Sequence, residues 1–276
     1  MKLIADSGST KTDWCSIEEN KPTLHFTTQG INPYMLSKGE ITNIFQKEVV
    51  AVLEGRKTNE VFFYGAGCTE EQAPIIATSI TEGLHCEKVE VHSDLLGAAR
   101  SLCHKSAGIA CILGTGSNSC LYDGEKIIEN VSPLGFILGD EGSGAVLGRN
   151  LVGDLLKGQL STKLVHLFFE ETGLTRAEIL NKVYKQNFPN RFLASLTHFI
   201  AIHKHEEKLH TFLLYHFSRF FTRNISLYNK PELPINFIGS IAYYFSDELK
   251  EAAKHEGYRI GHIQKSPMEG LKTYHA

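Results

Sequence analysis

The chain opens with an acidic residue followed by a turn of very small residues. Residues 6–13 read Asp-Ser-Gly-Ser-Thr-Lys-Thr-Asp. Small side chains let backbone N–H groups approach an anion closely, and the hydroxyl groups add further donors. A carboxylate beside such a turn can hold Mg²⁺ on a bound phosphate, directly or through water. Asp, Ser and Gly are also common in ordinary hairpin turns, so this segment alone leaves both interpretations open.

A second turn of the same kind follows a buried strand at Gly114-Thr115-Gly116-Ser117-Asn118. The dinucleotide-binding fingerprint Gly-x-Gly-x-x-Gly requires a helix directly after the turn. Here Ser119 replaces the third glycine, and the residues that follow predict a strand and an Asp-Gly turn. The Gly-x-x-x-x-Gly-Lys-Ser/Thr phosphate loop is absent from the chain. The turn therefore fits neither of these two nucleotide-binding patterns.

Three more positions combine small or acidic residues with the expected end of a strand or start of a helix. The run Gly139-Asp140-Glu141-Gly142-Ser143 puts two acids before a predicted helix, where they bind a ligand or cap the helix. Ile238-Gly239-Ser240 joins a strand to a helix, and its N–H groups are suited to a phosphate or an adenosine pocket. Asp94 begins a helix after a strand, a common position for substrate contacts in α/β folds and also for a cap.

The elements that must position these residues form two similar series. The first predicts the order β-β-β-α-β-α-β-α, with strands at 2–6, 12–17, 24–28, 61–64 and 88–92 and helices that start near Ser37, Thr69 and Asp94. Capping-box spacing at Ser37/Glu40 and Thr69/Gln72 marks two of these starts. The second series predicts strands at 108–113, 119–122, 126–131, 235–238 and 258–263, with helices at 143–151, 162–170, 175–185, 190–202, 207–228, 241–254 and from Pro267.

This order predicts an α/β protein of two domains, each a β-meander with crossover helices. The first domain covers 1–106 and is joined by a terminal helix at 265–276; the second covers 107–264 and is rich in helices. Glycine turns in matched positions of the two halves predict a cleft between them, and ligand sites favour such interfaces.

Composition narrows the function classes. The chain has 276 residues, a formal net charge of −3 and 42% hydrophobic residues, enough to bury a core. With no block of Lys and Arg, we expect no nucleic-acid partner. With no long apolar run and a charge soon after Met1, we expect neither a membrane span nor an export signal, and hence a cytoplasmic protein. The six cysteines contain no Cys-x-x-Cys pair, so we expect small buried apolar residues rather than a zinc site.

Taken together and in this order, the motifs resemble the actin-like sugar kinase/Hsp70 superfamily of ATPases. Within it the chain resembles the N-acetylglucosamine kinase branch, which is grouped with the BadF/BadG/BcrA/BcrD ATPases. The most specific part is Gly-Thr-Gly-Ser-Asn at 114–118, followed about twenty residues later by Gly-Asp-Glu-Gly-Ser at 139–143. The resemblance implies two ribonuclease H-like domains, with ATP and Mg²⁺ as cofactors.

The resemblance also implies roles for individual residues. Asp94 would be the catalytic base, and Asp6 would hold Mg²⁺. Contacts to ATP would come from Gly8, Ser9, Thr10, Lys11, Gly114, Thr115, Gly116, Ser117, Gly239 and Ser240. Sugar hydroxyls would be held by Asn32, Asn118 and Asp140.

The implied activity is transfer of the γ-phosphate of ATP to the 6-hydroxyl of an amino sugar, with N-acetylglucosamine as the first choice. Glucosamine and N-acetylmuramic acid are the alternative acceptors, because Ser132-Pro133-Leu134-Gly135-Phe136 stands where the family has a Trp-Gly-His segment near the sugar. Two other classes remain open: an ATPase activator of a dehydratase or reductase, with a shared iron–sulfur cluster, and a non-catalytic ATP- or sugar-binding regulator. The sequence leaves a homodimer open.

Overall fold

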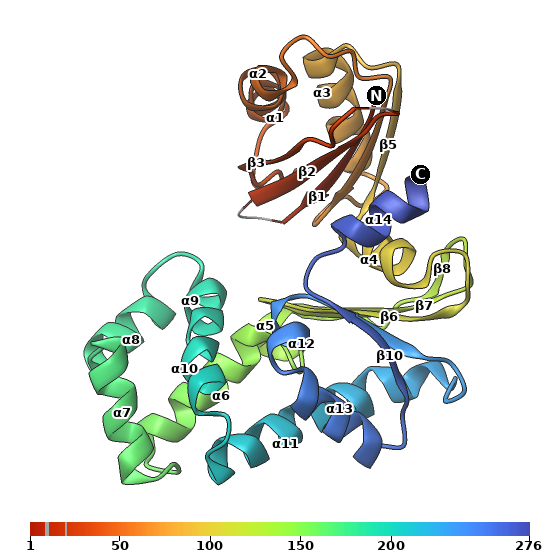
Figure 1. Ribbon diagram of the computed structural model, residues 1–276. Helices are drawn as coiled ribbons and strands as arrows, with labels where there is room; N and C mark the ends of the chain where they lie inside the picture. Colours follow the sequence, from red (N-terminus) through yellow and green to blue (C-terminus); the bar gives the residue numbers. More distant parts are fainter. Residues whose placement is uncertain (9–10, 20) are drawn as a thin grey trace. The chain divides into compact units, whose positions relative to one another are not determined.

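Figure 1 shows the computed structural model, which describes residues 1–8, 11–19 and 21–276. The chain forms two compact units. Unit 1 consists of Met1–Ser106, Asp123–Ile127 and Ser266–Ala276, and unit 2 of Ala107–Tyr122 and Ile128–Lys265.

Unit 1 is built on a mixed five-stranded sheet in the order β3-β2-β1-β4-β5. The first three strands form an antiparallel meander, and β4 and β5 run parallel to β1. Its elements are, in chain order, β1 (Lys2–Ser7), β2 (Lys11–Ile17), β3 (His25–Gln29), α1 (Lys38–Ile44), a π-helical turn η1 (Phe45–Val49), α2 (Val50–Leu53), β4 (Glu60–Gly65), α3 (Ala73–Leu84), β5 (Lys88–Ser93), α4 (Asp94–Cys103) and α14 (Met268–His275).

The sheet of unit 1 is covered on both faces because side chains alternate along each strand. Leu3 and Phe63 point to the face that packs on α1, η1 and α3, where Trp14 lies in the core. Ile4 and Phe62 point to the other face and pack against Met268 and its neighbours on α14. Figure 1 shows α4 and α14 on this second face. Burial on both faces fixes the strand register, and with it the position of the residues at the strand ends.

The first helix of unit 1 begins as predicted, and the second does not. Ser37 Oγ accepts the Glu40 N–H (3.4 Å) while the Glu40 carboxylate accepts the Ser37 N–H (2.8 Å), a complete capping box. The predicted box at Thr69/Gln72 is wrong, because α3 begins only at Ala73 and has no side-chain cap. Pro74 lies in its first turn, where a missing N–H and a fixed φ favour a helix start.

Unit 2 repeats the arrangement, with a five-stranded sheet in the order β10-β9-β6-β7-β8. β6 and β7 are antiparallel, whereas β9 runs parallel to β6 and β10. Its elements are β6 (Gly108–Leu113), β7 (Ser117–Tyr122), β8 (Ile127–Glu129), α5 (Gly135–Leu138), α6 (Gly144–Leu156), α7 (Thr162–Thr172), α8 (Arg176–Tyr184), α9 (Pro189–Ser195), α10 (Thr197–His203), α11 (Glu207–Arg223), a 3-10 turn η2 (Ile225–Tyr228), β9 (Ile235–Ile238), α12 (Ser240–Tyr244), α13 (Ser246–His255) and β10 (Ile260–Gln264). The predicted α/β fold with two meander-based, crossover-connected halves is confirmed.

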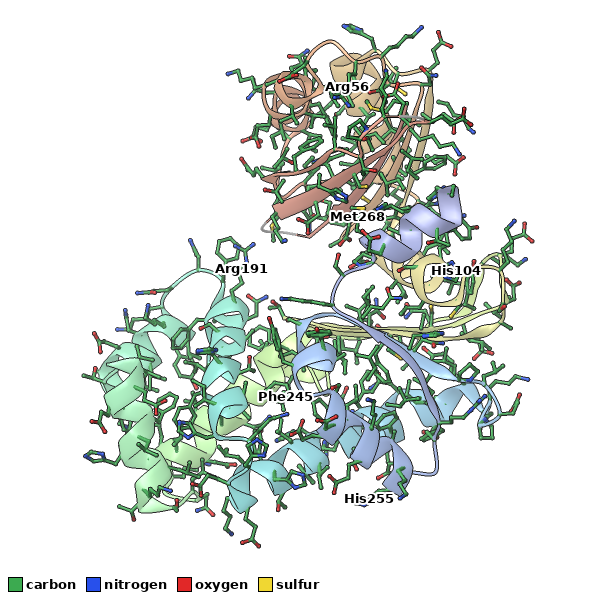
Figure 2. All side chains as sticks on the ribbon, in the orientation of Figure 1. Arg56, His104, Arg191, Phe245, His255 and Met268 are labelled. Atoms are coloured by element: carbon green, nitrogen blue, oxygen red, sulfur yellow. The ribbon has the colours of Figure 1, made fainter. Side chains whose placement is uncertain are left out.

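Three predicted helices of unit 2 are each divided in two. The stretch 190–202 forms α9 and α10, 207–228 forms α11 and η2, and 241–254 forms α12 and α13. At the last break Phe245 is buried in the core and marks the junction in Figure 2. Each piece can then turn its apolar residues toward the same core, which a single straight helix over these lengths would not achieve.

Two sequence predictions are tested by burial and helix length. All six cysteines are buried, as expected for small apolar residues. Across the part of the chain that the structure describes, no helix combines the length and apolar character needed to cross a membrane.

Candidate active-site residues

Two carboxylates lie at the same edge of the unit 1 sheet. Asp6 is near the end of β1, and Asp94 follows directly after β5, which is parallel to β1 with β4 between them. Burial raises the pKa of Asp6 to about 7, and the carboxylates of Asp94 and Asp13 act in the same direction, against the weaker effect of Lys11. Asp13 faces Asp6 across the β1–β2 pair and forms an ion pair with Lys11 (2.8 Å). The sequence prediction did not include Asp13, although it ends the quoted motif.

Asp94 is held in place by the start of α4. Its Oδ1 accepts the N–H of Leu95 (2.9 Å), and Ser93 caps the helix by accepting the N–H of Leu96 (3.2 Å). Burial raises the pKa of Asp94, and the backbone hydrogen bond from Leu95 opposes this rise. A carboxylate that is oriented through one oxygen and has a raised pKa is suited to accepting a proton.

The turn after Asp6 is tied to the loop that carries Asn32. Ser7 Oγ lies 2.7 Å from Thr12 Oγ1, donates to the carbonyl of Ile31 and accepts the Ile31 N–H, both at 3.0 Å. Gly8 closes the turn through its N–H to the Lys11 carbonyl (3.0 Å). Ser9 and Thr10, predicted to contact phosphate, lie outside the described residues. Sequence reasoning missed the positioning role of Ser7, because a turn hydroxyl does not reveal a partner 24 residues away.

Asn32 is fixed by its own loop and by a glycine from the β4–α3 connection. Its Oδ1 accepts the N–H of Tyr34 (2.9 Å). Gly67 has φ +80°, and a Cβ there would lie 2.8 Å from Asn32 Oδ1. Glycine is therefore needed at 67 both for the backbone conformation and for the approach of Asn32. Asn32 thus lies in the loop after β3 and Asp94 at the first position of α4 after β5, both within unit 1.

In unit 2 the predicted phosphate turn and the predicted adenosine motif are in direct contact. Gly114 begins the turn between β6 and β7 and donates its N–H to the Gly116 carbonyl (2.9 Å). Gly239 follows β9, which pairs with β6, and has φ +118°. A Cβ at Gly239 would lie 2.3 Å from the Leu113 carbonyl oxygen and 3.3 Å from the Gly114 nitrogen. The close pairing of β6 and β9 thus requires a glycine where the two motifs meet.

These motifs line a depression of about 270 Å³ within unit 2. Gly114, Thr115 and Ser240 form one wall, and Arg191 and Thr197 from the α9–α10 region form another. Figure 2 labels Arg191 near the start of α9. The size and the mixture of backbone, hydroxyl and guanidinium groups suit part of a nucleotide. The amphipathic pattern of 190–202 gave no sign that Arg191 reaches this place.

Helix α9 reaches the turn because α6 has glycines where the two helices touch. A Cβ at Gly148 would lie 1.9 Å from the carbonyl oxygen of Leu193. A Cβ at Gly144 would lie 3.1 Å from Ala194 and 3.2 Å from the Gly114 carbonyl. The same carbonyl accepts the Gly144 N–H (2.8 Å). The start of α6 therefore links the Gly114 turn to α9.

Asp140 and Asn118, both predicted to bind sugar, lie beside the same turn. The Asp140 carboxylate lies 3.0 Å from the position of a Cβ on Gly116. Burial raises the pKa of Asp140 to about 6, while the Ser117 N–H opposes the rise and the Glu141 charge adds to it. Asn118 Oδ1 accepts hydrogen bonds from Ser119 N and Asn130 Nδ2, both at 2.9 Å. Sequence reasoning missed Asn130, which fixes the orientation of the Asn118 amide.

Glu141, next to Asp140 in the chain, pairs with residues at the end of α11. Its carboxylate contacts the Arg223 guanidinium and accepts Asn224 Nδ2 at 3.4 Å, both from the end of α11. The preceding segment forms the short helix α5, which the sequence did not predict. Leu134, Ile137 and Leu138 there are 60%, 71% and 72% exposed. The segment before Asp140 thus presents exposed apolar side chains.

The described residues contain no group of three or more His, Cys, Asp or Glu side chains arranged to hold a metal ion. Mg²⁺ does not need such a group, since it is commonly bound by one or two carboxylates together with substrate phosphates and water. Asp6 fits that role, because a nearby cation would stabilise the ionised form that burial and two acidic neighbours disfavour.

Comparison with solved structures places the chain in a family. A Porphyromonas gingivalis protein described as "Putative N-acetylglucosamine Kinase" is 50% identical over 100% of this chain and 98% of its own, with a TM-score of 0.96. The chain belongs to this N-acetylglucosamine kinase-like family. No protein-family model and no curated protein matches the sequence.

More distant structures share the fold of the family. A protein from Chromobacterium violaceum with the same description is 15% identical over 99% of this chain and 98% of its own, with a TM-score of 0.76. A ROK family glucokinase from Streptomyces griseus, solved with glucose and AMPPNP, is 13% identical over 99% of this chain and 97% of its own, with a TM-score of 0.59. At these identities the likeness concerns the fold, which is shared by many sugar kinases.

Proposed function

We propose that this protein is an ATP-dependent sugar kinase that phosphorylates the 6-hydroxyl of an amino sugar, with N-acetylglucosamine as the preferred acceptor. The observation that carries the proposal is the 50% identity along the whole chain to the Porphyromonas gingivalis protein described as "Putative N-acetylglucosamine Kinase". The arrangement of acidic and glycine-rich segments in each unit supports it and suggests a role for each residue.

In unit 1, Asp94 is proposed to act as the general base. Its Oδ1 is engaged by Leu95, so Oδ2 is available to accept the proton of the sugar hydroxyl as the hydroxyl oxygen attacks the γ-phosphate. The raised pKa makes Asp94 a better proton acceptor than an exposed aspartate once it is ionised. Asn32 is proposed to hold a sugar hydroxyl, and the Gly8–Lys11 turn to contact phosphate.

Asp6 is proposed to hold Mg²⁺, with Asp13 and Lys11 adjusting the local charge. When bound, the ion supplies positive charge that offsets the negative charge of the triphosphate. Asp6 contributes an ionised carboxylate whose direction is fixed by the β1 pairing with β2 and β4. Phosphoryl transfer needs little covalent chemistry from the protein. Holding the reacting groups in fixed positions therefore supplies most of the rate enhancement.

In unit 2, the Gly114–Ser117 turn is proposed to contact phosphate through its backbone N–H groups. Gly239 and Ser240 are proposed to border the adenosine, with Arg191 on the facing wall of the same depression. Asp140 and Asn118, on the other side of Gly116, are proposed to hold sugar hydroxyls. The buried Asp140 accepts backbone N–H groups, which leaves it oriented for a hydroxyl donor.

The alternative of an ATPase activator with a shared iron–sulfur cluster is disfavoured by the cysteines. Cluster ligands shared between subunits need thiolates at an exposed surface. All six cysteines are buried within their unit, and burial raises the pKa of Cys68 to about 12. Burial also raises the pKa of Cys15 and Cys86, so these three thiols stay protonated at neutral pH, and none of the six cysteines is exposed.

The proposal is tested by a coupled assay of ADP release with Mg-ATP and a panel of acceptors. The panel includes N-acetylglucosamine, glucosamine, N-acetylmuramic acid, glucose and N-acetylmannosamine. We expect the highest kcat/KM for N-acetylglucosamine and a product that carries phosphate on the 6-oxygen by ³¹P–¹H NMR. Preference for another amino sugar would correct the acceptor, and absence of sugar-dependent ADP release across the panel would refute the kinase activity.

A further inference from the structure

A second depression in unit 2, of about 280 Å³, lies next to α5 and has no role in the proposed reaction. Its walls come from α5, the start of the Gly139–Ser143 segment, α6 and α11. The residues that matter for the argument are Leu138, Glu141, Arg149, His216, Arg219 and Arg223. Asp140 is not part of the lining, and its carboxylate lies against Gly116 instead.

The depression has more positive than negative groups. Three arginines line it, and Glu141 is the single acidic residue in the lining. Arg223 is paired with Glu141. Arg149 donates to the carbonyls of Phe136 and Ile137 (3.2 Å for Ile137). Within the described residues neither Arg149 nor Arg219 forms an ion pair with a carboxylate, so two positive charges are left without an anionic partner.

Of the three arginines, Arg219 has the fewest hydrogen bonds and ion pairs within the described residues. Its Nη1 donates to the Tyr215 hydroxyl at 3.3 Å, and its guanidinium lies 5.8 Å from the Tyr215 ring centre. Arg219 and Arg223 are four residues apart on α11, a spacing that places their like charges side by side, where they repel each other. An anion between them would turn this repulsion into attraction.

His216 lies in the wall of the depression and is affected by the same arginine charges. Its side chain is 7% exposed, and its pKa is lowered to about 4 by burial first and then by the charges of Arg219 and Arg149. At neutral pH the imidazole is therefore uncharged and has one N–H to donate. A bound anion would oppose the effect of the arginines and move the pKa of His216 upward.

We propose that this arginine-lined depression is a binding site for a compact dianion, inorganic phosphate or a phosphate monoester. Guanidinium groups from α6 and α11 offer paired N–H donors, the geometry that matches phosphate oxygens. The volume admits a phosphate with a small attached group. The excess of two positive charges matches a dianion, and His216 adds a neutral donor to the wall.

Occupation of the depression would also affect the neighbouring Asp140. Arg149 holds the carbonyls of α5 and Arg223 holds Glu141, so a dianion that draws on either arginine changes the contacts on both sides of Asp140. This coupling to sugar binding rests on the proposed function, whereas the binding of the dianion does not. The experiment therefore measures binding with neither sugar nor ATP present.

The test is calorimetric titration of the full-length chain with inorganic phosphate, followed in parallel by the ¹H–¹⁵N signals of the His216 ring. Arg219→Gln removes the guanidinium that has the fewest other partners, and Arg219 itself is exposed. Arg176→Gln, at the exposed start of α8, is the control with the same change of charge. We expect saturable binding to the parent protein and to the control, and binding weakened at least about tenfold by Arg219→Gln. Phosphate should raise the pKa of His216 in the parent and leave it unchanged in Arg219→Gln.

Further variants and ligands make the outcome decisive. Arg219→Lys keeps the charge without the paired donors and should bind with intermediate affinity, and its melting temperature together with that of Arg219→Gln reports folding. A hexose 6-phosphate that binds more tightly than inorganic phosphate would identify a monoester as the ligand, and equal affinity would identify the free ion. Unchanged phosphate affinity in Arg219→Gln, no saturable binding to the parent, or a His216 signal indifferent to phosphate would each overturn the proposal.

Discussion

Replacement of Asp94 by Asn tests the proposed base with little disturbance of the fold. The Asn side chain keeps an oxygen that can accept the Leu95 N–H, and the Ser93 cap of α4 is untouched. General-base catalysis contributes about 10²–10⁴ in rate. At about 1.36 kcal/mol per tenfold change, kcat should therefore fall by the equivalent of about 2.7–5.4 kcal/mol, with a small change in KM.

The same variant changes two pH dependences in a defined direction. Because the pKa of Asp94 is raised, parent kcat should rise with pH as the carboxylate ionises, and this rising limb should disappear in Asp94→Asn. The charge of Asp94 also helps to raise the pKa of Asp6, so its removal should lower the pKa of Asp6. Steady-state ADP release from pH 5 to 9 and ¹³C NMR of labelled aspartate measure the two effects. A folded Asp94→Asn enzyme with less than a tenfold loss of kcat would refute the assignment.

Three other variants address the remaining candidate residues. Gly239→Ala puts a Cβ against the Leu113 carbonyl at a φ that disfavours side chains, and should cost about 1–3 kcal/mol by urea unfolding and weaken ATP binding. Gly153→Ala, in open space on α6, is the control and should be neutral or stabilising, so equal losses in the two variants would contradict the argument. For Asp6, a folded-state pKa of about 7 against 3.8 favours folding below pH 3.8, and this contribution is lost as pH rises through 7. Asp6→Asn should therefore flatten the pH dependence of the melting temperature over this range and abolish turnover, and an unchanged profile would contradict the burial argument. Ser7→Ala leaves the Ile31 N–H without its partner and should lower the free energy of unfolding by about 1–3 kcal/mol in urea titrations, and an unchanged stability would contradict the structural role of Ser7.

The sequence predicts the sheets well because two signals coincide there: a run of apolar residues marks the strand, and a glycine marks its end. In β6 and β9 a run of buried residues ends at a glycine, and both boundaries agree with the prediction. Asp94 at a strand end and Ser143 before α6 are also correctly placed, since a cap acts through neighbouring backbone N–H groups. Local chemistry of this kind needs no knowledge of the rest of the chain.

Features that depend on tertiary contact are the ones the sequence does not reveal. The α9–α10 division depends on α6, whose Gly148 admits the Leu193 carbonyl. Helix α5 has no amphipathic pattern, and Arg149 from α6 holds its carbonyls. Likewise, the spacing of residues along the chain shows neither the Ser7 bonds to Ile31 nor the approach of Arg191 to the Gly114 turn. Each of these contacts joins segments that are far apart in the chain.

The position of α14 has a consequence for biosynthesis. Met268 and Leu271 complete the second face of the unit 1 sheet, His275 stacks on Phe62 at 3.9 Å, and the Tyr64 hydroxyl lies 2.8 Å from the His275 ring. As the ribosome makes the chain from its N-terminus, the first five strands emerge long before residues 266–276. Helix α4 can cover its part of this face early, but the part that Met268 and Leu271 cover stays exposed until translation of unit 2 is finished. Docking of α14 is therefore the last step in the folding of unit 1.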